Sequence, residues 1–156
     1  MLRMSVVALA FAVCVGPAAA SELAGAWFAD GRCYQRVYDA AHLARNPGQQ
    51  TTRIWVGGRS GDARLSAGEL NLGLDTRAGG GFSGMAVCRD ASITLVCGIE
   101  GDGGNVRLMR QGQELRLTVA DRLQLEGARD FSPELGGRDD RVFILRRAPA
   151  AACRPG

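Results

Sequence analysis

Apolar and polar side chains alternate along most of this chain. Residues 69–74 place three leucines on one side of an extended backbone, and residues 114–119 repeat the pattern with two leucines and a valine. A period of two is typical of a β-strand that buries one face and exposes the other. The same criterion predicts further strands at residues 26–29, 32–37, 52–56, 92–99, 105–109, 122–125 and 141–145.

Turn-forming residues separate these segments at intervals of about ten residues. The chain has 22 glycines, and glycines or aspartates stand at most of the breaks. Short strands joined by frequent turns favour an antiparallel sheet with one buried face. We therefore expect an all-β protein, a small antiparallel β-barrel (alternatively a sandwich) of about eight strands with one short helix. The expected turns are at residues 79–81, 89–90, 101–104, 111–112, 120–121 and 136–137.

The short helix is predicted at residues 38–45, which read YDAAHLAR. Asp39 is a residue type that commonly caps a helix N-terminus. The Asn-Pro-Gly sequence at residues 46–48 ends the helix, because proline and glycine disfavour its continuation. A helix of about two turns is not stable alone, so we expect it to pack against the sheet.

The first twenty residues are typical of a secretory signal peptide. A basic residue precedes an apolar run at residues 6–15, and three alanines at residues 18–20 form a cleavage site before Ser21. An apolar run of this length is too short to span a membrane, which takes about 20 residues. We expect residues 1–20 to be a signal peptide and residues 21–156 to form one periplasmic or secreted domain without a membrane span.

Four cysteines remain after the signal peptide: Cys33, Cys88, Cys97 and Cys153. An even number in an exported chain indicates two disulfides, for which three pairings exist. We favour Cys88–Cys97, which closes a short loop, and Cys33–Cys153, which joins the ends of the domain. Loop-closure entropy assigns about 3 kcal/mol to the first and about 5 kcal/mol to the second. No two of these cysteines have the close spacing of zinc ligands, so we expect no metal site.

The charge of the chain is small and basic. All 19 basic residues are arginines, against 16 acidic residues, and the formal net charge is +3. The charge falls to +2 when Arg3 leaves with the signal peptide. The arginines are spread along the chain, and so small a charge argues against a nucleic-acid partner.

His42 is the single histidine and lies in the predicted helix. A histidine relay needs a serine or cysteine nucleophile, but no serine has the G-x-S-x-G context and the cysteines are assigned to disulfides. We therefore expect no enzymatic activity, and an enzyme that uses His42 ranks as the third alternative. Tyr38, His42 and Arg45 form the most distinctive polar surface of the sequence, and we expect a binding site there.

Two acidic groups resemble fragments of calcium sites. Glu100 and Asp102 lie in a glycine-rich segment, and Asp139 and Asp140 form a second pair. Neither group has the twelve-residue frame of an EF-hand loop. Solvated turns are the favoured explanation, the alternative of calcium binding stays open, and we expect no cofactor.

Gly25-Ala26-Trp27, near the start of the mature chain, resembles the G-x-W sequence that opens the first strand of lipocalins and related barrels of the calycin group. The order of the predicted elements is also similar. The resemblance implies an eight-stranded barrel with a ligand cavity or an inhibitory rim, in which Arg146 or Arg147 stacks on Trp27. Exported bacterial inhibitors of metalloproteases are similar to this profile as well.

Two disulfides, many hairpins and glycine-rich loops predict a binding module of the cell envelope. Its most specific form is a protein-binding, inhibitor-like domain that recognises an envelope protein through its loops. The alternative is a carrier of a small apolar ligand inside the barrel. An empty interior cavity of about 300 Å³ or more would favour the carrier. The sequence predicts no oligomeric state.

Overall fold

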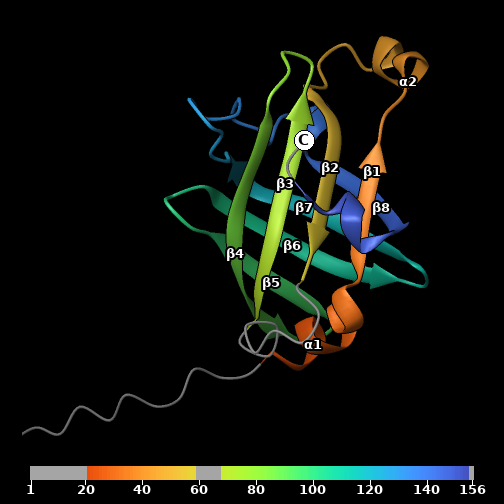
Figure 1. Ribbon diagram of the computed structural model, residues 1–156, viewed down its shortest axis with the longest axis vertical. Helices are drawn as coiled ribbons and strands as arrows, with labels where there is room; N and C mark the ends of the chain where they lie inside the picture. The colour runs from red at the N-terminus through yellow and green to blue at the C-terminus, as the bar shows by residue number, and fades with distance from the viewer. Residues whose placement is uncertain (1–20, 59–67, 155–156) are drawn as a thin grey trace, which may run out of the picture.

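The computed structural model describes residues 21–58 and 68–154, which form a closed barrel of antiparallel strands. Each strand pairs with the next along the chain, and the first pairs with the last (Figure 1). The barrel prediction is confirmed, and the sandwich alternative is wrong. The predicted signal peptide, residues 1–20, lies outside the described residues. The strands are β1 (Cys33–Val37), β2 (Thr51–Gly57), β3 (Glu69–Thr76), β4 (Gly81–Ala91), β5 (Thr94–Ile99), β6 (Gly104–Gln111), β7 (Glu114–Leu123) and β8 (Val142–Ala148).

Short helices surround this barrel. In the view of Figure 1, β1–β4 lie in front and β5–β8 cross behind them at a steep angle, so the barrel has two opposite outer walls. The end of the chain runs over the front wall. The helical elements are α1 (Glu22–Phe28), α2 (Ala40–Arg45) and the 3-10 turns η1 (Ala29–Gly31), η2 (Arg138–Asp140) and η3 (Ala150–Ala152).

Apolar side chains fill the inside of the barrel. The alternation in β3 and β7 places their leucines inward, and Leu72 and Leu117 are at most 1% exposed. Phe143 from β8 and Tyr34 from β1 are fully buried between them. The period of two in the sequence is therefore the signature of a packed interior.

The strand predicted at residues 26–29 is wrong, because residues 26–28 belong to α1 and residue 29 begins η1. The hydroxyl of Ser21 accepts a hydrogen bond from the N–H of Ala24 and so caps the helix. Ala24, Trp27 and Phe28, which have the spacing of one helix face, all pack into the core at one end of the barrel. The Gly25-Ala26-Trp27 sequence thus lies in a helix before the first strand. Within the described residues, neither Arg146 nor Arg147 stacks on Trp27, so the predicted stacking is wrong.

Two predicted turns are wrong for a common reason. Residues 89–90 lie inside β4, a strand that the sequence did not predict, and residues 120–121 lie inside β7. The β4–β5 turn is instead at Ser92 and Ile93, where Ser92 has a φ of 58° and Ile93 is 70% exposed. In both cases an aspartate near the end of a long strand looks like a break when only its polarity is considered.

The short helix is confirmed as α2. The Asp39 carboxylate accepts the N–H of His42 at 2.7 Å, as predicted for an N-cap, and the helix ends before Asn46. Within the described part of the chain, no helix combines the length and the apolar character needed to cross a bilayer.

The segment between α2 and β2 is held by a buried carboxylate. Asp140, which is 4% exposed, accepts the backbone N–H groups of Gln50 at 2.6 Å and of Thr51 at 3.1 Å. This aspartate comes from η2, which is distant in sequence, so it fixes the end of the barrel that carries α2.

We expect Asp140→Ala to lower the free energy of unfolding by about 3 kcal/mol, because it leaves two backbone donors without their acceptor. Chemical denaturation followed by circular dichroism measures the effect. The matched control is Asp139→Ala, at a more exposed neighbour, which should change stability by less than about 1 kcal/mol. Equal effects of the two substitutions would contradict this assignment.

Candidate binding site on the outer wall

The polar surface predicted around α2 is only partly assembled. Tyr38 and His42 stack, with their ring centroids 4.5 Å apart, and the guanidinium of Arg36 lies 5.2 Å from the Tyr38 ring. His42 Nε2 is 3.0 Å from Gln49 Oε1. Arg45 is exposed and borders a separate hollow of about 460 Å³ between α2 and η2. The structure therefore groups Tyr38 with His42 and places Arg45 elsewhere.

The pKa of Tyr38 is raised above its ordinary value. Burial disfavours the phenolate most strongly, Arg36 partly opposes that effect, and Asp140 adds to it. We expect Tyr38 to remain protonated at pH values at which an exposed tyrosine ionises. Replacing Arg36 by Gln should raise the pKa further.

The raised pKa of Tyr38 predicts how the stability of the protein changes with pH. Because the folded-state pKa lies above the unfolded value, the folded state binds more protons in alkaline solution. The contribution of Tyr38 to stability should therefore be constant below about pH 9 and fall as the pH rises past about 10. Unfolding measured along this range should show a shallower fall for Tyr38→Phe, and an unchanged slope would contradict the shift.

The predicted disulfides are both present. Cys33 in β1 is bonded to Cys153 after η3, across a sequence separation of 120 residues. Cys88 and Cys97 are directly opposite in β4 and β5 and are bonded inside the core. The first disulfide holds the end of the chain against the barrel, and the second joins two neighbouring strands.

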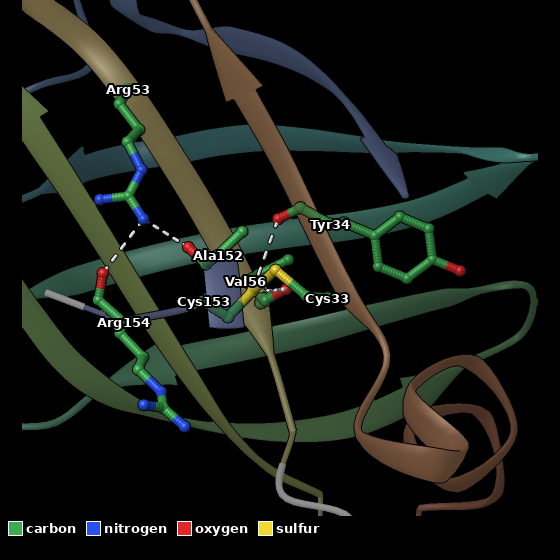
Figure 2. Close-up of a disulfide and its surroundings, with 7 residues drawn as sticks. All are labelled: Cys33, Tyr34, Arg53, Val56, Ala152, Cys153 and Arg154. Carbon is green, nitrogen blue, oxygen red and sulfur yellow. Dashed lines mark hydrogen bonds between the residues drawn. A yellow bond between two sulfur atoms is a disulfide. The ribbon is translucent and has the colours of Figure 1, made fainter. Parts of the chain in front are cut away.

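The end of the chain is also held by an arginine on the outer wall. Arg53 of β2 donates hydrogen bonds from Nη2 to the backbone oxygens of Ala152 and Arg154 (Figure 2). Its Nη1 forms an ion pair of 3.2 Å with Asp75 of β3. The sulfur of Cys153 lies 3.2 Å from the carbonyl oxygen of Val56. Residues 149–154, called the tail below, are therefore fixed across β1 and β2.

Two glycines provide the space under the tail. A Cβ on Gly57 would lie 2.8 Å from the sulfur of Cys153, and a Cβ on Gly73 would lie 2.3 Å from the indole of Trp55. Trp55 points outward in β2 between the inward Ile54 and Val56, yet it is only 2% exposed. Its ring lies over Gly73 of the neighbouring strand, a position that any larger residue would fill.

A hollow of about 810 Å³ opens beside this tryptophan. Strands β2, β3 and β4 contribute one part of its lining, and η1 and the tail contribute the rest. Residues 59–67 are outside the described part of the chain and are not included. The lining consists of Asp30, Gly31, Trp55, Gly57, Gly58, Asn71, Ser83, Gly84, Met85, Ala150, Cys153 and Arg154.

The indole N–H of Trp55 is the most informative group of this site. Its Nε1 atom is buried and has no hydrogen-bond partner in the described structure. A buried donor without an acceptor costs about 1–3 kcal/mol, so it is retained only where something compensates. The N–H can donate to a carbonyl or carboxylate oxygen, and the exposed Arg154 adds a cation on the same rim.

The sequence patterns did not predict this site, although the sequence contains one signal of it. In residues 52–56 the inward positions are those of Ile54 and Val56, so the tryptophan between them has the parity of a solvent-facing residue. A large aromatic residue at such a position, opposite a glycine-containing strand, indicates that something covers the outer wall. The register that aligns Trp55 with Gly73 is not apparent from the sequence.

The acidic groups have structural surroundings of their own. Glu100 and Asp102 are exposed in the β5–β6 turn, and Asp140 is engaged by backbone donors. Over the residues that the structure describes, no group of three or more His, Cys, Asp or Glu side chains is placed to hold a metal ion.

Comparison with known proteins gives no relative: no family model, curated protein or solved structure matches this chain.

Proposed function

We propose that this protein is an exported binding module that holds a segment of an envelope protein on its outer wall, in the manner of an inhibitor-like domain. One observation carries the proposal: the hollow of about 810 Å³ is bordered by a buried Trp55 whose N–H has no acceptor. A bound peptide segment would supply that acceptor through a backbone carbonyl oxygen.

The size and rigidity of the hollow support this role. Its volume falls in the range of about 300–1,000 Å³ that is usual for ligand sites. The disulfide to Cys153 and the hydrogen bonds from Arg53 hold the tail in place before a ligand arrives. Because the tail is already ordered, binding against it loses less conformational entropy, and this favours a high affinity.

The packed interior favours the outer wall over the alternative of an apolar carrier. Leucines from β3, β5, β6 and β7 and the aromatic side chains of α1 and β8 occupy the space in which an apolar ligand would lie. Entry of such a ligand would require these side chains to move, at the cost of the contacts they make. The recognition surface also differs from the one predicted, since strand faces and the tail line most of the hollow and turns line little of it.

Photo-crosslinking in the cell envelope tests the proposal. A photoreactive amino acid at Asn71, an exposed residue of the lining, should yield one discrete adduct with a protein. The matched control carries the same amino acid at Ala44, an exposed residue of α2 that does not line the hollow, and should not yield that adduct. Filling the hollow with Ser83→Trp should abolish the adduct at position 71 while the protein stays folded by circular dichroism.

Two results would overturn the proposal. An adduct that forms equally from positions 71 and 44 would show that the hollow is not the contact. An apolar small molecule that copurifies with the protein and survives Ser83→Trp would favour the interior carrier.

A further inference from the structure

The outer surface of β4–β8, called the basic wall below, carries a row of arginines. Arg89 on β4, Arg107 on β6, Arg116 on β7 and Arg146 on β8 all occupy outward positions of their strands. We call these four residues the arginine row. Their strands are neighbours in the closed sheet, with β5 between β4 and β6 (Figure 1).

The strand register gives the spacing of the row. Val96 of β5 pairs with both Arg89 and Arg107, so these two arginines are two strand widths apart, about 10 Å. Arg107 is opposite Thr118, two residues from Arg116, and a diagonal step of this kind spans about 7–8 Å. A diagonal step of the same kind separates Arg116 from Arg146.

That last step is fixed by the pairing of β7 with β8. Arg116 is opposite Ile144, and Arg146 is two residues further along β8 in the same direction. Arg107, Arg116 and Arg146 therefore lie on one diagonal, and Arg89 lies straight across β5 from Arg107.

Counter-charges are scarce on this wall. Among the residues of β5–β8, all of which the structure describes, two exposed or partly exposed carboxylates lie on this surface: Glu114 is paired with Arg146 at 3.0 Å, and Asp121, near the end of β7, accepts hydrogen bonds from the backbone and side chain of Asn105. Arg89, Arg107 and Arg116 have no ion pair or hydrogen bond from their guanidinium groups within the described residues. On the front wall, in contrast, Arg53 is held by both a carboxylate and backbone oxygens.

Partly buried apolar side chains lie between these arginines. Val96, Met109 and Ile144 share the outward face with them. Three guanidinium groups without an ion pair, with apolar side chains between them, are complementary to a chain that presents carboxylates on one side.

We propose that the arginine row binds an acidic polypeptide segment in an extended conformation. In an extended chain, alternate side chains lie on one side and about 6.6–7 Å apart, which matches the diagonal steps of the row. A membrane is a poorer match, because the exposed large apolar residues of these strands are two valines, Val87 at 48% and Val142 at 38%, and no aromatic side chain of β4–β8 projects outward to insert. This surface is separate from the hollow and does not depend on the function proposed for it.

Fluorescence anisotropy with two synthetic peptides tests the proposal. A labelled peptide of alternating Glu and Thr should bind the full mature protein at low ionic strength, and its Gln–Thr counterpart should not. The affinity should fall at least about tenfold between 20 and 300 mM salt, because exposed charge pairs are screened. The double variant Arg107→Gln/Arg116→Gln should weaken binding about tenfold.

The control removes the same charge at another place. Arg45→Gln/Arg129→Gln, two exposed arginines outside the row, should leave the affinity within about twofold. Failure of the Glu–Thr peptide to bind at low salt, or an equal loss in both double variants, would overturn the proposal. Binding to vesicles of anionic phospholipid without binding to the peptide would assign the wall to a membrane and would also overturn it. None of these outcomes bears on the hollow, which Ser83→Trp tests separately.

Discussion

Replacing Cys33 and Cys153 together by alanine should lower the free energy of unfolding by about 5 kcal/mol. The disulfide closes a loop with a sequence separation of 120 residues, and loop-closure entropy in the unfolded chain grows with that separation. Urea denaturation of the oxidised proteins measures the difference. The variant should also lose protection of the tail in hydrogen exchange, because Arg53 alone is left to hold it.

The second disulfide provides the comparison. Cys88→Ala/Cys97→Ala removes a loop with a separation of only 9 residues, for which the entropic contribution is about 3 kcal/mol. This variant should leave the tail protected. If the free energy of unfolding of the Cys33/Cys153 variant lay within about 1 kcal/mol of the parent value, the Cys33–Cys153 disulfide would contribute little to stability.

Gly73→Ala should destabilise the protein by about 3 kcal/mol, a large effect for the addition of one methyl group. The new Cβ would lie 2.3 Å from the Trp55 ring, which has to leave its place on the strand. The emission of Trp55 should shift to longer wavelength as the indole moves toward water. Denaturant unfolding and fluorescence of the same samples provide both measurements.

A second background separates this mechanism from a general intolerance of side chains in the strand. In a Trp55→Leu protein, Gly73→Ala should cost less than about 1 kcal/mol, since the clash is removed. Gly98→Ala, at a strand glycine whose Cβ would have only an ordinary 3.7 Å contact, should also have a small effect. A loss at Gly73 that persists in the Trp55→Leu background would contradict the packing described for the hollow.

Much of the fold follows from local patterns in the sequence. The alternation of leucines in β3 and β7 predicts inward faces because a strand has a strict period of two. Asp39 predicts the start of α2 because its carboxylate can satisfy a free backbone N–H. The disulfides follow from the even number of cysteines and from the short loop that one pair closes.

The strand wrongly predicted at residues 26–29 shows what happens where the same residues suit two kinds of secondary structure. Residues 26–29 suit a strand by composition, but Ala24, Trp27 and Phe28 have helical spacing and Ser21 caps the helix they form. That spacing was visible in the sequence, but the cap and the contact with the core decide the outcome.

The binding surfaces depend on the strand register, which local patterns do not determine. Trp55 lies over Gly73 only because β2 and β3 pair in one particular alignment. The arginine row likewise exists only in the closed sheet, since its members come from four strands. A sequence in which the arginines are spread evenly therefore folds into a protein with a basic wall.

The most direct test of the account is the indole signal of Trp55 in a ¹⁵N NMR spectrum. The chain has two tryptophans, so Trp27 in the core serves as an internal reference. On addition of blocked tetrapeptides, which offer backbone carbonyl oxygens without charged ends, the Trp55 N–H signal should move downfield as it gains an acceptor, while the Trp27 signal stays in place. A shift of the Trp27 signal with Trp55 unchanged would place the ligand inside the barrel and contradict a binding site on the outer wall.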